Sequence, residues 1–440
     1  MRSGTWKSRS TALALVMVVG LGAAACSSTS TASTTTTTGG TSSTTGSTSR
    51  SIPASAFSDH TGVSSSAIQI GNVSTLSLGL FKGAQVGTQA YVDYVNSTGG
   101  VNGRKLVLNN ADDSFTGAGN KQATQNALQS DLALVGNFSL EDSFGGTVLA
   151  ANPGFPDVSQ ILDNATNKLP NVYSPIPLAD GWASGPMTYY YNKFKADASH
   201  AGAFLADSPS AAQTWAGEKY VAEKEGFKFV SEQTYATTQT DFNQQVIAMK
   251  NAGVRIIFMD QMPANYASSV FKALAQQNFH PQVLLGAATY SSQLIPQSGA
   301  ANVNGAYLSQ NLALYLGTDQ TAVPAVATFL HWVQVASPGF NPDLFTSYGW
   351  LSADLFVQGL KNAGSNPSRG SLLQALSKVT SFNGNGFNAP SDPATKTPPN
   401  CYLIATVTNG QFVRSPDNPP TSGSTGGFRC DGSYIVKPGT

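Results

Sequence analysis

The sequence predicts an α/β protein whose parallel sheets are covered by helices on both sides. Short β-branched or apolar runs recur along the chain, and each is followed by apolar residues at helical spacing. Strands that alternate with helices in this way favour parallel sheets. The length of 440 residues is enough for two domains or lobes, each with its own core. No repeat of fixed period is visible, which argues against a solenoid or a propeller.

Residues 1–25 have the pattern of a signal peptide. A basic start is followed by an apolar run over residues 11–25, about fifteen residues and shorter than a membrane-spanning helix requires. Residues 23–26 (AAAC) resemble the lipobox of bacterial lipoproteins, although that motif usually has Leu where this chain has Ala23. The resemblance implies that Cys26 is lipidated and becomes the new N-terminus. The alternative is an ordinary signal peptide with an incidental cysteine.

Residues 26–51 predict a tether. They consist almost entirely of Ser, Thr and Gly, which cannot bury enough apolar surface to fold. As a flexible coil, this stretch spans about 27 Å, far enough to hold a globular body clear of a membrane. The body is expected to begin between residues 52 and 67.

The predicted strands are short and separated by helical segments. The strand candidates are Ile68–Val73, Lys105–Asn110, Leu132–Gly136, Ala201–Asp207, Val254–Asp260 and Val283–Ala287. Apolar residues at steps of three and four predict helices across residues 80–94, 242–249 and 267–274. A hairpin is expected at Asn409-Gly410, because this dipeptide lies between two β-branched or apolar runs.

The composition excludes several classes of function. The chain has 24 basic and 24 acidic residues, so it lacks the basic surface that nucleic-acid binding requires. Its three Cys cannot supply a four-thiolate zinc or iron–sulfur site. The four His lie far apart, and no HExxH, G-x-S-x-G, Walker or complete G-x-G-x-x-G motif is present. We therefore expect no catalytic residues, no metal and no cofactor.

A resemblance to a known family begins at residue 67. The segment 95–105 (VNSTGGVNGRK), followed by Asp112-Asp113, is similar to the start of the branched-chain amino-acid-type solute-binding proteins of ABC transporters. Weaker similarities follow as far as about residue 390. The resemblance implies two doubly wound lobes joined by three crossovers, with a solute held between them. Lobe 1 would comprise residues 67–176 and 312–382, and lobe 2 residues 177–311 and 383–440. Asp112-Asp113 itself is more typical of a strand-end cap or turn than of a ligand contact.

The resemblance also assigns contacts in lobe 1. Ser139 falls where the family binds the carboxylate of its ligand, although it could equally be the N-cap of the following helix. Ser159 and Gln160 match the next contact loop, although the family's Ser/Thr-Pro-Ala-x-Thr motif is not kept. Phe81 could cover the ligand or belong to the core of the first helix.

In lobe 2 the chain departs from the family. Ser210 stands where an aromatic residue is common, and Asp260 and Met262 follow the next strand. The loop 286–290 (GAATY) has no acid where amino-acid-binding members place one against the ammonium. An unpaired buried ammonium costs several kcal/mol. Either Asp260 replaces that acid, or the solute is not an α-amino acid. We favour the second, with Met262 and Tyr290 indicating a more apolar or aromatic molecule.

Two cysteines remain once Cys26 is assigned to the anchor. Cys401 and Cys430 lie in the last forty residues, and outside the cytoplasm such a pair most simply forms a disulfide. Two free thiols are the alternative.

The sequence therefore predicts a solute-binding protein that is lipid-anchored to the outer face of a bacterial cell membrane. It would deliver a small-molecule solute to an ABC permease, contact the membrane only through its anchor, bind no nucleic acid and act as a monomer. Two alternatives remain, a ligand-sensing surface receptor of the same fold and an uncharacterised hydrolase.

Overall fold

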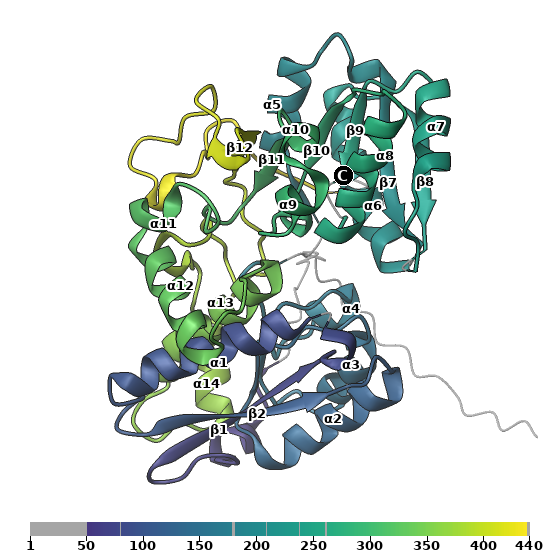
Figure 1. The fold of residues 1–440 in the computed structure, drawn as a ribbon. Helices are drawn as coiled ribbons and strands as arrows, with labels where there is room; N and C mark the ends of the chain where they lie inside the picture. The colour runs from purple at the N-terminus through teal and green to yellow at the C-terminus, as the bar shows by residue number, and fades with distance from the viewer. Residues whose placement is uncertain are drawn as a thin grey trace, which may run out of the picture. The chain divides into compact units, whose positions relative to one another are not determined.

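The computed structural model of the protein describes residues 51–79, 81–177, 181–207, 209–236, 238–259 and 262–437. The predicted signal peptide, Cys26 and almost all of the predicted tether lie outside these residues. The described chain contains two large sheets, drawn in Figure 1 with the helices that cover them.

The first sheet has five parallel strands in the order β2-β1-β3-β4-β5. They are β1 (Ala67–Ser74), β2 (Lys105–Asp112), β3 (Leu134–Val135), β4 (Asp157–Val158) and β5 (Val172–Tyr173). Successive residues of one strand belong to different hydrophobic clusters, one on each face of the sheet. Leu134 belongs to the core beside α2 and α3, whereas Val135 belongs to the core that contains α1 and α13. Both faces are therefore buried, as a doubly wound parallel sheet requires.

Helices from two parts of the chain cover this sheet. From the N-terminal part come η1 (Ala54–Ser58), η2 (Ser77–Gly79), α1 (Lys82–Ser97), α2 (Gly117–Ser130), α3 (Asp142–Ala151) and α4 (Asn164–Asn167). The later helices α12 (Pro324–Ala336) and α13 (Leu344–Asn362) pack against α1, and α14 (Arg369–Leu376) packs against α13 and η1 (Figure 1). Segments far apart in sequence thus complete one layer.

The second sheet has seven strands in the order β13-β12-β11-β10-β9-β7-β8. Five are parallel, namely β7 (Ala201–Ala206), β8 (Phe229–Tyr235), β9 (Ile256–Met259), β10 (Gln282–Leu285) and β11 (Tyr307–Gln310). The hairpin β12 (Leu403–Thr408) and β13 (Gln411–Arg414) extends it antiparallel at one edge. Asn409 and Gly410 have φ of 51° and 74°, which confirms the predicted tight turn.

Further helices and one small sheet complete the described chain. They are α5 (Gly185–Lys193), η3 (Ala198–His200), α6 (Pro209–Glu225), α7 (Asn243–Asn251), α8 (Ala264–Gln276), η4 (Ala287–Thr289), α9 (Leu294–Ser298), α10 (Ala300–Val303), α11 (Asp319–Ala322), η5 (Gly384–Gly386) and η6 (Thr425–Gly427), with a small antiparallel pair of β6 (Trp182–Ala183) and β14 (Ile435–Val436).

The chain passes between the elements of the two sheets three times. It leaves the first sheet after β5, returns after β11 to form α12–α14, and leaves again after α14 to form β12. The third passage is tied to the first, because Ser391 Oγ donates to Pro175 O at 2.7 Å and Lys396 Nζ donates to Val172 O. The predicted α/β class, with two parallel sheets and three crossovers, is therefore confirmed.

Candidate functional site

Polar residues gather at the carboxyl edge of the first sheet, where ligands bind in open α/β folds. Thr75 follows β1, Asp113 follows β2, and Ser139 and Ser159 follow β3 and β4. The backbone N–H of Thr75 donates to Phe138 O at 3.2 Å, which places the ends of β1 and β3 together. The sequence correctly predicted that Ser139 and Ser159 lie at strand ends.

Ser139 is bound to a buried carboxylate that the sequence pattern did not single out. Its hydroxyl donates to Asp113 Oδ2, which also accepts from Thr75 Oγ1 at 3.1 Å and Asn120 Nδ2 at 3.2 Å. Ser139 is only 3% exposed, and its oxygen accepts from the N–H of Glu141 at 2.9 Å. Since its one hydrogen is committed to Asp113, this hydroxyl in this arrangement has none to donate to the carboxylate of a solute.

Ser159 and Gln160 also have partners inside the protein. Ser159 Oγ accepts from the N–H of Asn137 at 3.0 Å, and Gln160 Oε1 accepts from Ser174 Oγ at 2.8 Å. Both residues are buried. Their ligand contacts therefore stay predictions, and in this structure they stabilise the loop that follows β4.

A buried carboxyl, Asp157, and a half-buried carboxyl, Asp142, lie behind that loop. Burial raises the pKa of Asp157 to about 7, and the negative charge of Asp142 adds to this rise against hydrogen bonds from Ser159 and Asn137. Burial also raises the pKa of Asp142 to about 6. Asp142 Oδ2 accepts from the backbone N–H of Leu162 at 2.6 Å, so this carboxyl fixes the loop after β4.

An aromatic wall lies at the same edge, and we define it as Phe81, Phe138, Phe345, Tyr348 and Leu162. The ring centroids of Phe81 and Phe138 are 4.9 Å apart, and Phe345 lies 4.8 Å from Phe81 and 4.7 Å from Phe138. Phe81 is 9% exposed, whereas Leu162, Phe345 and Tyr348 are half-buried and keep part of their surface open. Phe81 is thus part of this cluster as well as the residue that precedes α1.

The aromatic wall includes residues that no sequence pattern selects. Phe345 and Tyr348 come from α13, more than two hundred residues after Phe138. The nearby Leu140 and Phe144 are exposed, at 41% and 47%, so the apolar surface at this edge extends beyond the wall.

In the second part of the chain, the predicted contacts Met262 and Tyr290 are fully buried. Tyr290 packs against Tyr315 and Phe412 at ring-centroid distances of 4.9 and 4.7 Å, and its oxygen accepts from the N–H of Leu316 at 2.7 Å. In this structure Tyr290 therefore holds the segment after β11. Asp260 lies outside the described residues, as does the side chain of Ser210, so their predicted roles stay predictions.

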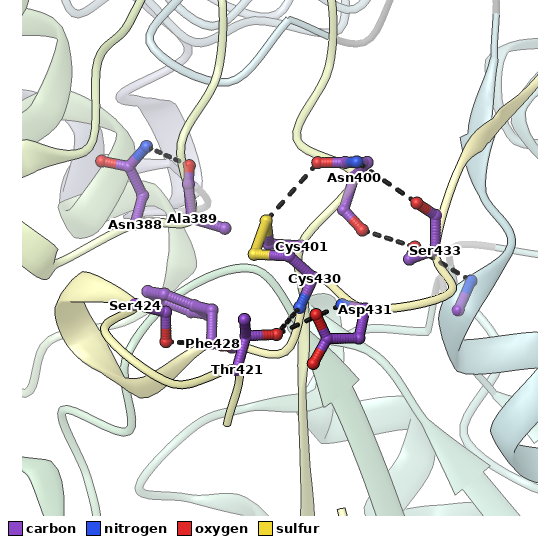
Figure 2. Close-up of a disulfide and its surroundings, with 11 residues drawn as sticks. Asn388, Ala389, Asn400, Cys401, Thr421, Ser424, Phe428, Cys430, Asp431 and Ser433 are labelled. Carbon is purple, nitrogen blue, oxygen red and sulfur yellow. Dashed lines mark hydrogen bonds between the residues drawn. A yellow bond between two sulfur atoms is a disulfide. The ribbon is translucent and has the colours of Figure 1, made fainter. Parts of the chain in front are cut away.

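The disulfide between Cys401 and Cys430 is present, with an S–S distance of 2.10 Å. Figure 2 shows it beside Thr421, whose Oγ1 accepts from the N–H of Cys430 at 2.8 Å and of Asp431 at 3.2 Å. Ser433 Oγ donates to Asn400 O at 2.5 Å next to it. The bond joins the third crossover to the C-terminal segment.

Removing this bond should lower stability. We expect the double variant Cys401→Ala/Cys430→Ala to lose about 3.5 kcal/mol of unfolding free energy, because the unfolded chain regains the freedom of a loop of about 30 residues. Denaturant unfolding measures the loss, and reduction of the unaltered protein should reproduce it. An unchanged midpoint in both experiments would contradict the prediction.

Within the described ranges, no group of three or more His, Cys, Asp or Glu side chains could hold a metal ion. None of the described helices is both long and apolar enough to cross a membrane.

Comparison with known proteins identifies the family. The model of a family described as "Periplasmic binding protein" matches residues 67–411. The Leu/Ile/Val-binding protein homolog 1 of Brucella suis biovar 1 (strain 1330) is 25% identical over 291 residues, which are 64% of this chain and 75% of that protein.

Solved structures share the fold at low identity. The fatty acid ABC transporter substrate-binding protein from Thermomonospora curvata has a TM-score of 0.66 at 18% identity, over 86% of this chain and 93% of its own. An ABC transporter solute-binding protein of R. palustris in complex with benzoate has a TM-score of 0.64 at 17% identity, over 79% and 95%. Because the family model covers more than half of the sequence, this chain belongs to the periplasmic binding protein family, and it is an extracytoplasmic solute-binding protein of the type I fold.

Proposed function

We propose that this chain captures a small, largely apolar solute against the aromatic wall and delivers it to an ABC permease. The wall is the observation that carries the proposal, because Phe345, Tyr348 and Leu162 keep apolar surface open at the edge where ligands bind in this fold class. The solute would lie between lobe 1 (residues 67–176 and 312–382) and lobe 2 (residues 177–311 and 383–440). The protein would act as a monomer.

The polar groups at this edge favour a solute other than an α-amino acid. Such a solute needs an acceptor for its ammonium, which carboxylates without an amine do not. The carboxylate of Asp113 already accepts hydrogen bonds from three side chains. The loop 286–290 contributes no acid. Unless Asp260 supplies the acid, an ammonium in a closed site would therefore lack a partner, which costs several kcal/mol.

The named relatives support an apolar solute. One is called a fatty acid transporter component, and another was solved with benzoate. The Brucella relative is named for leucine, isoleucine and valine, whose side chains are apolar. An apolar contact surface is common to these solutes, whereas an ammonium belongs only to the amino acids.

The solute class can be tested by calorimetry with a panel of compounds. We expect aromatic carboxylates or fatty acids to bind and leucine, isoleucine and valine to bind weakly or not at all. Phe345→Ala should weaken the binding of the apolar solute at least about fivefold, because truncating a central aromatic contact can cost more than about 1 kcal/mol. Phe57→Ala is the matched control, since Phe57 is an exposed phenylalanine of η1 in contact with α14.

Tight binding of an aliphatic amino acid would overturn this assignment. If Asp260→Ala then abolished that binding, Asp260 would be the acid that replaces the one missing from the loop 286–290.

We also propose that a lipid on Cys26 anchors the protein to the membrane. The support is the sequence alone, since Cys26 follows three alanines at the end of a signal-peptide pattern. Cys26→Ala is expected to move the protein from the membrane fraction to the soluble fraction or the medium. Cell fractionation followed by immunoblotting measures this change, and the Cys401→Ala/Cys430→Ala variant should stay with the membrane. Retention of the Cys26 variant in the membrane fraction would refute the anchor.

A further inference from the structure

A small, partly open cavity lies between the first sheet and the helices α2, α3 and α4. Its volume is about 20 Å³, and its polar lining includes Asn137, Asp142, Asp157, Gln160 and Thr166. The apolar core residues Leu134 and Leu149 close it on other sides. It lies behind the loop that follows β4, and it is too small for a metabolite.

Two polar atoms of this lining have no partner among the described residues, Asp157 Oδ1 and Gln160 Nε2. Both side chains are 1% exposed. Their other polar atoms are bonded, because Asp157 Oδ2 accepts from Asn137 Nδ2 at 3.2 Å and Gln160 Oε1 accepts from Ser174 Oγ at 2.8 Å. An unpaired buried polar atom costs about 1–3 kcal/mol, so two in one cavity indicate a shared partner.

Ser174 holds the Gln160 amide on one side. Gln160 Oε1 accepts from Ser174 Oγ at 2.8 Å, and Ser174 Oγ accepts from the N–H of Ile176 at 3.2 Å. With Oε1 bonded, Nε2 is the amide group that still lacks a partner among the described residues. An anion would meet the carboxyl of Asp157, and a bare cation would meet the amide hydrogens of Gln160. Water accepts from the amide and donates to the carboxylate.

We propose that this cavity binds one water molecule that bridges Asp157 Oδ1 and Gln160 Nε2. The volume fits a single molecule, since a buried water needs roughly 10–15 Å³ of such space and two to four polar partners. The water joins the end of β4 to the loop that carries Gln160. The water adds a further hydrogen-bonded contact to this loop, which Asp142 already binds through the N–H of Leu162.

The bridging water also couples the hydrogen bonds of this loop to the ionisation of Asp157. The charged groups that act on Asp157 are Asp142 from α3 and Lys396 from the third crossover. A water donates more strongly to the ionised carboxylate than it accepts from the neutral acid, so it favours the ionised form. Without it, the ionised form would lose a donor, and the pKa of Asp157 would rise further above its usual value.

The first test is a crystal structure of the full chain at a resolution that shows ordered waters. We expect a water within hydrogen-bond distance of Asp157 Oδ1 and Gln160 Nε2 in the unaltered protein and in Phe57→Ala, and none in Gln160→Leu. Phe57→Ala is the control, because Phe57 is exposed and does not line the cavity. A dry cavity, a bound ion, or a Gln160 side chain turned to another partner would each overturn the proposal.

The second test follows the carboxyl of Asp157 by NMR titration or difference infrared spectroscopy. The titration midpoint of Asp157 should move to higher pH in Gln160→Leu and stay in place in Phe57→Ala. An unchanged midpoint in a folded Gln160→Leu protein would overturn the coupling. If Gln160→Leu does not fold, the titration and the crystal structure of the unaltered protein still decide whether a water contacts Asp157.

Discussion

Replacing Arg414 by methionine is expected to lower the unfolding free energy by about 3–5 kcal/mol, the usual cost of leaving one buried charge without its partner. Arg414 Nε donates to Asp319 Oδ1 at 2.9 Å and Arg414 Nη2 donates to Asp319 Oδ2 at 2.7 Å. Asp319 is 4% exposed, so its carboxylate would keep only the N–H of Leu314, 2.7 Å away, as a donor. Denaturant unfolding measures the loss.

An exposed ion pair of the same chain supplies the control. Lys193 Nζ contacts Asp417 Oδ2 at 2.5 Å, but the two side chains are 28% and 50% exposed. Lys193→Met should therefore cost less than about 1 kcal/mol. Adding Asp319→Asn to Arg414→Met should restore part of the lost unfolding free energy, because it removes the unpaired negative charge of Asp319. Equal effects of Arg414→Met and Lys193→Met would contradict the burial argument.

The stability of the protein should also depend on the ionisation of Asp157. Burial raises the pKa of Asp157 to about 7 in the folded protein, from an ordinary value of 3.8. The folded state therefore holds this proton more tightly than the unfolded state. Its stabilising effect is fully present below about pH 4 and is lost as pH rises towards 7, a total of about 4 kcal/mol.

Denaturant unfolding at about pH 5 and about pH 8 measures this contribution, which should amount to about 3 kcal/mol between those two conditions. The carboxyl of Asp142, with its pKa raised to about 6, contributes in the same direction. Asp157→Asn should remove only the contribution of Asp157, so the unfolding free energy of this variant should change less with pH. An Asp157→Asn variant with the same pH dependence as the unaltered protein would show that this carboxyl is not the cause.

Much of the fold could be predicted because its long strands and helices leave a clear pattern. The structure has strands at all six predicted positions, and α1, α7 and α8 correspond to predicted helices. The strands β4 and β5 were missed because two residues are too few to show a period. The strand β8 was missed although it is seven residues long, because its less exposed positions include the polar Ser231 and Gln233, so its sequence does not alternate between apolar and polar residues.

The candidate site was predicted in position but not in its contacts. The hydroxyls of Ser139 and Ser159 lie at strand ends as expected, yet their partners Asp113 and Asn137 are chosen by the packing of neighbouring strands. The sequence pattern at Asp112-Asp113 is typical of a turn or cap. Asp112 accepts from the N–H of Ser114 and Asp113 from the N–H of Phe115, as turn residues do, but Asp113 also forms the centre of a buried network.

The aromatic wall could not be derived from local sequence at all. Phe345 and Tyr348 reach Phe138 only because α13 returns to pack on α1. A local pattern shows that a helix has an apolar face, but it does not show which distant strand end that face will meet.

Native mass spectrometry of the protein purified from its own host can show which solute the aromatic wall binds. We expect a retained small molecule that is largely apolar and lacks a primary amine. Phe345→Ala should lose this molecule and Phe57→Ala should keep it. A retained aliphatic amino acid, or a solute held equally by both variants, would contradict the assignment of the aromatic wall as the binding surface.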